Sequence, residues 1–169
     1  MKYFKNTIII IFLSFCIYSC SESGSSEPEN NSFQIEKSKK RGISYNLVNE
    51  LDLEALKGGV SWWYNWYFKT DAPDGYYENF EMEFIPMLWG RNSSADFVEL
   101  KNFILDHPEI KYLLVLNEPN LVDQANLTPS QAVAEWIKYE KVISDLDAEN
   151  RTVYLVGPAM TWGTMTDYW

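Results

Sequence analysis

The sequence predicts an α/β fold, specifically a (β/α)8 barrel that the chain follows only to about its fifth strand. From residue 40 onward, short apolar runs typical of strands alternate with amphipathic runs typical of helices. Such alternation implies a parallel sheet. No glycine-rich phosphate turn of the GxGxxG or GxxxxGK type occurs in the sequence, which argues against a doubly wound dinucleotide-binding sheet. Polar and aromatic residues gather instead where the strands end, as in a barrel.

Hydrophobic spacing defines the first elements. Leu47, Leu51 and Ala55 recur at helical intervals, and the β-branched and aromatic run that follows is typical of a strand. The predicted order is a strand at 42–45, a helix at 47–56, a strand at 60–64, a loop at 65–79 and a strand at 83–89 that Pro86 interrupts.

The later elements have clearer signals. A helix is predicted at 95–106, followed by a strand at 111–116 that is apolar on both faces, as in sheets covered on both sides. Thr128, Pro129 and Gln131 form a predicted capping box that begins the next helix. A fifth strand is predicted at 152–156.

The number of strands falls short of a barrel. A complete barrel needs about 250 residues and eight strands, and residues 40–169 account for five. We therefore expect the N-terminal portion of a barrel at 39–169. The alternative is a five-stranded open sheet, which would leave its edge strands bare.

The N-terminus has the pattern of an export signal. Lys2 and Lys5 precede a short apolar run, and Ile17-Tyr18-Ser19-Cys20 resembles a bacterial lipobox. We expect a lipoprotein signal peptide at 1–19, and then an acylated Cys20 with a flexible Ser-, Glu- and Asn-rich tether at 20–38. This places the protein in the cell envelope, anchored in a membrane, with the outer membrane favoured. The alternative is an ordinary signal peptide cleaved a few residues later.

Composition narrows the function classes. The chain has 24 acidic and 14 basic residues and a net charge of -10, which argues against nucleic-acid binding. It has one His, and its two Cys lie in or next to the signal segment. We therefore predict no metal site and no cofactor.

Carboxylate chemistry is predicted at the end of the fourth strand. Glu118 there has an apolar wall behind it and the barrel mouth in front, the setting of a general acid for a glycosidic oxygen. Asn117 is expected to bind a sugar hydroxyl.

Aromatic residues are expected to bind the substrate. Strand alternation places Trp62 and Tyr64 on one face of their strand and Trp63 on the other, where Trp63 could equally belong to the core. Because sugar rings stack on aromatic side chains, the predicted substrate-binding residues are Tyr45, Trp62, Tyr64, Asn65, Trp66, Trp89, Asn120 and Trp162.

Five segments of the chain together point to one family: 40–45, 60–66, 84–90, 114–120 and 124–129. They resemble glycoside hydrolase family 128, the endo-β-1,3-glucanases with an Asl1-like catalytic core. The resemblance implies a (β/α)8 barrel glycosidase, a retaining mechanism, a β-1,3-glucan substrate and Glu118 as the acid/base. The family's nucleophile is a second Glu on a later strand, which this sequence does not reach.

Two other functions are compatible with the same residues. One is a carbohydrate-binding lipoprotein that uses the aromatic cleft without turnover. The other is a barrel glycosidase for a different β-glycan, such as a β-1,4-mannan or cellulose. In each case the expected partners are a β-glycan polysaccharide or oligosaccharide and, through the lipid anchor, a membrane.

Overall fold

The computed structural model describes residues 37–163, 166 and 168, all within one unit, Gln34–Trp169. The predicted signal peptide at 1–19, Cys20 and the tether up to residue 36 lie outside the described residues. Over the described ranges, every helix is too short or too polar to cross a bilayer.

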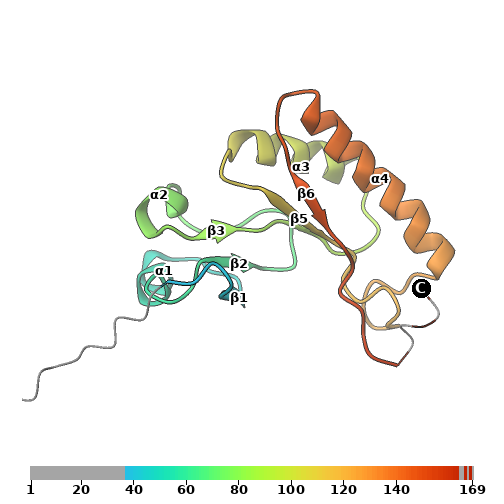
Figure 1. Cartoon of the computed structure of the whole chain (residues 1–169), viewed down its shortest axis with the longest axis horizontal. Helices are drawn as coiled ribbons and strands as arrows, with labels where there is room; N and C mark the ends of the chain where they lie inside the picture. Colours follow the sequence, from blue (N-terminus) through green and yellow to red (C-terminus); the bar gives the residue numbers. More distant parts are fainter. Residues whose placement is uncertain (1–36, 164–165, 167, 169) are drawn as a thin grey trace, which may run out of the picture. The chain divides into compact units, whose positions relative to one another are not determined.

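Helices and parallel strands alternate along the described residues (Figure 1). The strands form two sheets, ordered β1-β2-β3 and β4-β5-β6, and every pair is parallel. This confirms the α/β class. The elements are β1 (Gly42–Ser44), α1 (Glu50–Leu56), β2 (Trp62–Tyr64), α2 (Tyr76–Phe80), β3 (Glu83–Phe84), β4 (Met87–Leu88), α3 (Ser94–Asp106), β5 (Tyr112–Val115), α4 (Pro129–Asp147) and β6 (Tyr154–Val156).

The strand predicted at 83–89 is in fact two strands, so the described residues hold six strands where five were predicted. The amide of Ile85 donates to the carbonyl of Trp63 at 2.9 Å, which continues the pairing of β3 with β2. The carbonyl of Pro86 then accepts from Leu114 at 3.0 Å, which begins the pairing with β5. Pro86 has no N–H for a ladder, so the change of partner falls at this residue.

The prediction of a loop at 65–79 is wrong at its end, where α2 begins. Gly75 precedes this helix with a φ of 77°, a conformation that glycine adopts readily. Tyr76 is buried, and its ring meets that of Trp63 edge-on at 5.0 Å. Burial of an aromatic ring thus stabilises a helix that is too short to leave a periodic signal in the sequence.

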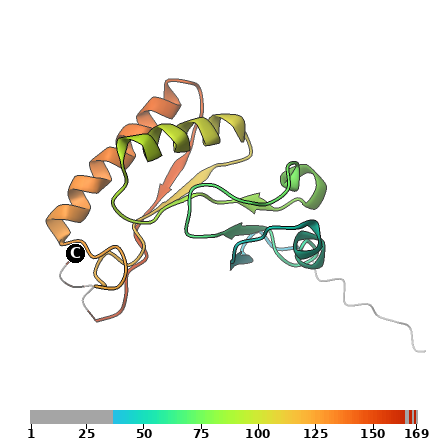
Figure 2. The ribbon, with the colours of Figure 1, turned by 180° about the vertical axis from the view of Figure 1, so that it is seen from behind.

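Helices α3 and α4 both pack on one face of the β4-β5-β6 sheet (Figures 1 and 2). Leu113 and Val115 of β5 are buried in this core with Ile104 of α3 and Leu146 of α4. On the opposite face Tyr112 is 42% exposed. Among the described residues, β5 is therefore covered on one side, whereas its sequence predicted cover on both.

A second core lies around β2. Trp63 is fully buried together with Leu53 of α1, Tyr76 of α2 and Phe84 of β3. Trp63 thus belongs to the core, which strand alternation left open. The predicted capping box is also confirmed, because Thr128 and Gln131 exchange side-chain and backbone hydrogen bonds at the start of α4.

Candidate active site

An open pocket of about 540 Å³ lies at the carboxyl ends of β2, β4 and β5. Ligands of parallel α/β sheets bind at this edge. Five predicted site residues line the pocket, with two that were not predicted: Tyr64, Trp66, Trp89, Asn117, Glu118, Gln124 and Ala159.

The backbone at the end of β5 lies between the segments that follow β4 and β6. The amide of Asn117 donates to the carbonyl of Trp89 at 2.8 Å. The amide of Glu118 donates to the carbonyl of Ala159, also at 2.8 Å. The two predicted catalytic-site residues are therefore held by ladder-like bonds on both sides.

Left-handed backbone on both sides of Asn117 shapes this end of the strand. Leu116 has a φ of 59° and Glu118 a φ of 44°. Each such non-glycine residue costs about 1–3 kcal/mol and persists only where the surroundings hold it. Successive residues of a regular strand point to opposite faces, yet Asn117 and Glu118 both line the pocket. The irregular backbone is what allows two adjacent side chains to serve one site.

Polar side chains from two later loops orient the two residues. The side-chain amide of Asn117, which is 8% exposed, donates from Nδ2 to Oε1 of Gln124 at 2.7 Å. The hydroxyl of Thr161 donates to Oε1 of Glu118 at 2.5 Å. Sequence reasoning missed Thr161, which lies in a loop without a motif, and it included Gln124 in the 124–129 resemblance without giving it a role.

Aromatic rings form one wall of the pocket. The rings of Tyr64 and Trp66 meet edge-on, with centroids 5.2 Å apart and planes at 69°. Trp66 is 43% exposed and Trp89 is 37% exposed. Each indole therefore offers free ring surface beside Glu118, which suits the flat C–H faces of a sugar.

Three of the remaining predicted substrate-binding residues are either exposed outside the pocket or hydrogen-bonded to a loop. Tyr45 and Trp162 are exposed and lie outside the pocket. Asn65 holds the loop after β2, because its Nδ2 donates to the carbonyl of Lys69 at 2.8 Å and its Oδ1 accepts from the amide of Tyr67. Their roles as substrate contacts stay predictions.

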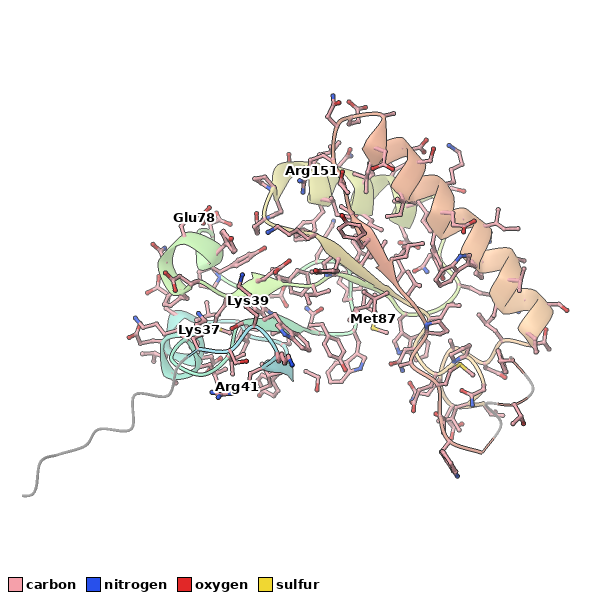
Figure 3. All side chains as sticks on the ribbon, in the orientation of Figure 1. Lys37, Lys39, Arg41, Glu78, Met87 and Arg151 are labelled. Carbon is pink, nitrogen blue, oxygen red and sulfur yellow. The ribbon has the colours of Figure 1, made fainter. Side chains whose placement is uncertain are left out.

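Trp62 and Asn120 also lie outside the lining of this pocket. Trp62 begins β2, at the opposite end from the site, and lines a different pocket with Lys37 and Lys39. Figure 3 shows both lysines near β2 and β3. The Asn120 side chain bonds to the backbone of Thr161. For these two residues as well, sugar contact stays a prediction.

Glu118 is the single carboxylate among the described residues that line the pocket. Over the same described ranges, no group of three His, Cys, Asp or Glu side chains is arranged to hold a metal ion. The chemistry that these residues offer is proton transfer by Glu118, hydrogen bonding by Asn117 and ring stacking.

A carboxylate, an oriented amide and exposed indoles thus lie together at the carboxyl ends of parallel strands, the arrangement expected for a site of the glycosidase class. The family model of the glycosyl hydrolase catalytic core matches residues 42–169. The chain belongs to this family and has the catalytic core of glycoside hydrolase family 128.

Solved structures give the same relationship. A family 128 subgroup II endo-β-1,3-glucanase from Pseudomonas viridiflava is 47% identical, with a TM-score of 0.69 over 78% of this chain and 49% of that one. The subgroup II enzyme from Sorangium cellulosum is 33% identical, with a TM-score of 0.56 over 73% and 47%. A subgroup I enzyme from Amycolatopsis mediterranei, solved with laminaritriose, is 26% identical, with a TM-score of 0.52 over 76% and 47%. The chain thus spans about half the length of these relatives. Comparison with curated protein sequences gave no match.

Proposed function

We propose that the chain carries the acid/base half of a retaining β-1,3-glucanase site. The observation that carries this proposal is the position of Glu118, in a pocket walled by Tyr64, Trp66 and Trp89 at the carboxyl ends of the strands. The solved relatives support the substrate class, since they are endo-β-1,3-glucanases and one was solved with laminaritriose.

In this mechanism Glu118 acts twice. It first gives its proton to the glycosidic oxygen as the bond to the anomeric carbon breaks, and it later takes a proton from the water that releases the sugar. A second carboxylate about 5–5.5 Å away forms the covalent intermediate. Among the described residues that line the pocket, Glu118 is the one carboxylate. We therefore propose that a later strand of the barrel supplies the nucleophile, as the family resemblance implies.

Asn117 has a distinct role in binding. Its Nδ2 is engaged by Gln124 at 2.7 Å, so its Oδ1 is the atom left to accept a hydrogen bond from a sugar hydroxyl. Hydrogen bonds to the 2-hydroxyl of the reacting sugar strengthen in the transition state of glycosidases. We assign this contact to Asn117.

We also propose that the two sheets are the first part of a (β/α)8 barrel. The sheet face opposite α3 and α4 supports this, because Tyr112, Leu114 and Met87 line an apolar hollow there. Apolar side chains fill the interior of such a barrel. The longer family 128 relatives are consistent with further strands closing over this face.

The functional test compares two proteins. One is the chain alone, and the other is the chain joined to the portion of the Pseudomonas viridiflava enzyme beyond the match. We expect reducing-sugar release from laminarin by the chimera and none by the chain alone, which lacks the second carboxylate in its described pocket. Laminarin binding without turnover by the chimera would instead favour the carbohydrate-binding function. Turnover of cellulose or mannan in preference to laminarin would reassign the substrate.

Glu118→Gln in the chimera tests the acid/base assignment. The amide keeps the size of the side chain but has no proton to transfer, so laminarin turnover should fall by about 10² to 10⁴-fold while oligosaccharide binding survives. Asp123→Asn is the matched control, because this exposed carboxylate lies five positions along the same segment and outside the pocket. Turnover by Glu118→Gln within a few-fold of the parent would refute the assignment.

A further inference from the structure

The segment after β6 returns to the acid/base. Thr161, 43 positions along the chain from Glu118, donates its hydroxyl proton to Oε1 of that carboxylate at 2.5 Å. The carbonyl of Ala159, two residues earlier, accepts from the amide of Glu118 at 2.8 Å. One short segment thus binds both the backbone and the side chain of Glu118.

Asn120, two residues beyond Glu118, also binds this segment. Its Nδ2 donates to the carbonyl of Thr161 at 2.7 Å, and its Oδ1 accepts from the amide of Thr161 at 3.1 Å. One side chain therefore holds both backbone polar groups of Thr161, which restricts where the threonine hydroxyl can lie. Glu118, Asn120 and Thr161 are each partly buried, so water has limited access to compete for these bonds.

We propose that Thr161, clamped by Asn120, is a positioning residue that selects which oxygen of Glu118 carries the catalytic proton. The proposal rests on the proposed function. Because Oε1 already accepts the Thr161 hydroxyl, the acid form of Glu118 carries its proton on Oε2. Asn120 then serves the site through Thr161, in place of the sugar contact predicted from sequence.

The same bond assists the proton transfer. Oε2 gives its proton to the glycosidic oxygen as the C–O bond breaks, and Glu118 becomes a carboxylate. Thr161 keeps its own proton throughout. A hydroxyl donates a stronger hydrogen bond to a carboxylate than to a neutral acid, so the bond from Thr161 strengthens as the transfer proceeds. An interaction that is stronger in the transition state than in the ground state raises kcat.

The kinetic test uses the laminarin-cleaving chimera. Thr161→Val removes the hydroxyl and should lower kcat about ten- to a hundredfold, with KM within about twofold, since a bond to a charged group is lost in the transition state. Thr161→Ser keeps the hydroxyl and should restore kcat to within a few-fold. Thr152→Val, at an exposed threonine just before β6, is the matched control and should leave both constants unchanged.

Asn120→Ala separates the clamp from a sugar contact. Loss of the clamp should lower kcat and leave KM nearly unchanged, whereas loss of a substrate contact would raise KM. Unchanged kcat in Thr161→Val, failure of Thr161→Ser to recover, or an effect of Asn120→Ala on KM alone would each overturn the proposal.

A second measurement needs no turnover and uses the chain itself. The side-chain carboxyl carbon of Glu118 should resonate at a shifted position in Thr161→Val, and at the parent position in Thr161→Ser and Thr152→Val. An unchanged resonance in Thr161→Val would overturn the proposal even if the chimera is active. A chimera without laminarin turnover would refute the proposed function, while the carbon spectrum would still decide whether Thr161 binds Glu118.

Discussion

Trp66 is the single side chain that best tests whether the aromatic wall of the pocket binds sugar. Its ring lines the pocket beside Glu118 and is 43% exposed. Trp66→Ala should weaken binding of laminari-oligosaccharides about tenfold, because the sugar loses a stacking surface. Calorimetric titration measures this loss. Tyr77→Ala is the matched control, since that exposed ring lies on α2 and does not line the pocket; equal losses in the two variants would remove Trp66 from the site.

Single residues of the site differ in how far sequence could identify them. The place of Glu118 and Asn117 in the pocket was predictable because they follow an apolar strand directly, while their catalytic roles stay predictions. Trp62 was grouped with Tyr64 by strand alternation, which gives the face of a residue but not the end of the strand at which it lies. The contacts of Thr161 and Gln124 with Glu118 and Asn117 could not be found, because these hydrogen bonds depend on loop conformations that no local pattern encodes.

At the level of elements, the pairing of β1 with β2 depends on Gly42. A Cβ at this position would lie 2.2 Å from the ring of Trp62, whose indole nitrogen is held by the carbonyl of Lys39 at 3.1 Å. Gly42→Ala should therefore cost about 1–3 kcal/mol of the free energy of unfolding, because the ring must move. Denaturant titration gives this value. Gly58→Ala, where a Cβ meets nothing within 4 Å, should stay within about 1 kcal/mol of the parent.

Glu83, at the start of β3, destabilises the fold when its carboxylate is charged. Burial raises the pKa of Glu83, although the backbone of Lys111 opposes the shift, and its Oε1 is buried without a hydrogen-bond partner among the described residues. A carboxyl whose pKa is higher in the folded state binds protons more readily there. The destabilisation by charged Glu83 is therefore absent below the pKa of the unfolded state. It grows as the pH rises from there to the pKa of the folded state, and it is complete above that pKa.

Glu83→Gln should accordingly raise Tm at neutral pH, and the gain should vanish as pH falls below the unfolded pKa. Thermal unfolding followed across pH measures both parts. Glu78→Gln, at an exposed position of α2, is the control for the loss of one negative charge and should leave Tm at neutral pH close to that of the parent. A lower Tm for Glu83→Gln at neutral pH would contradict the sign of this effect.

Elements with complete local signals were predicted well. The capping boxes at Ser93 and Thr128 satisfy the first amides of α3 and α4 by short-range bonds, and the helix predicted at 95–106 is within one residue of α3. The division of 83–89 was not predictable, because the same apolar run serves two partners and only tertiary pairing decides where it changes. A proline in a strand signals a break but does not identify the new partner.

At the level of the whole molecule, we propose that lipid attached to Cys20 anchors the protein in the envelope. Cys20 lies outside the described residues, and the proposal rests on the lipobox-like sequence at 17–20. Radiolabelled palmitate fed to producing cells should label the parent protein and not Cys20→Ala, which should be soluble or unprocessed. Equal labelling of the two proteins would exclude acylation at this residue.

The change of strand partner at Pro86 should couple amide hydrogen exchange in the two sheets. Ile85 is bonded to Trp63 of β2, and Leu114 of β5 is bonded to Pro86. These adjacent bonds lie on either side of the change of partner, so neither sheet can separate without disturbing the other. Deuterium exchange of the two amides should then give one common opening free energy, set by opening of both sheets together. The two sheets would form one cooperative unit, and a destabilising change in β1 would speed exchange in β5 as well.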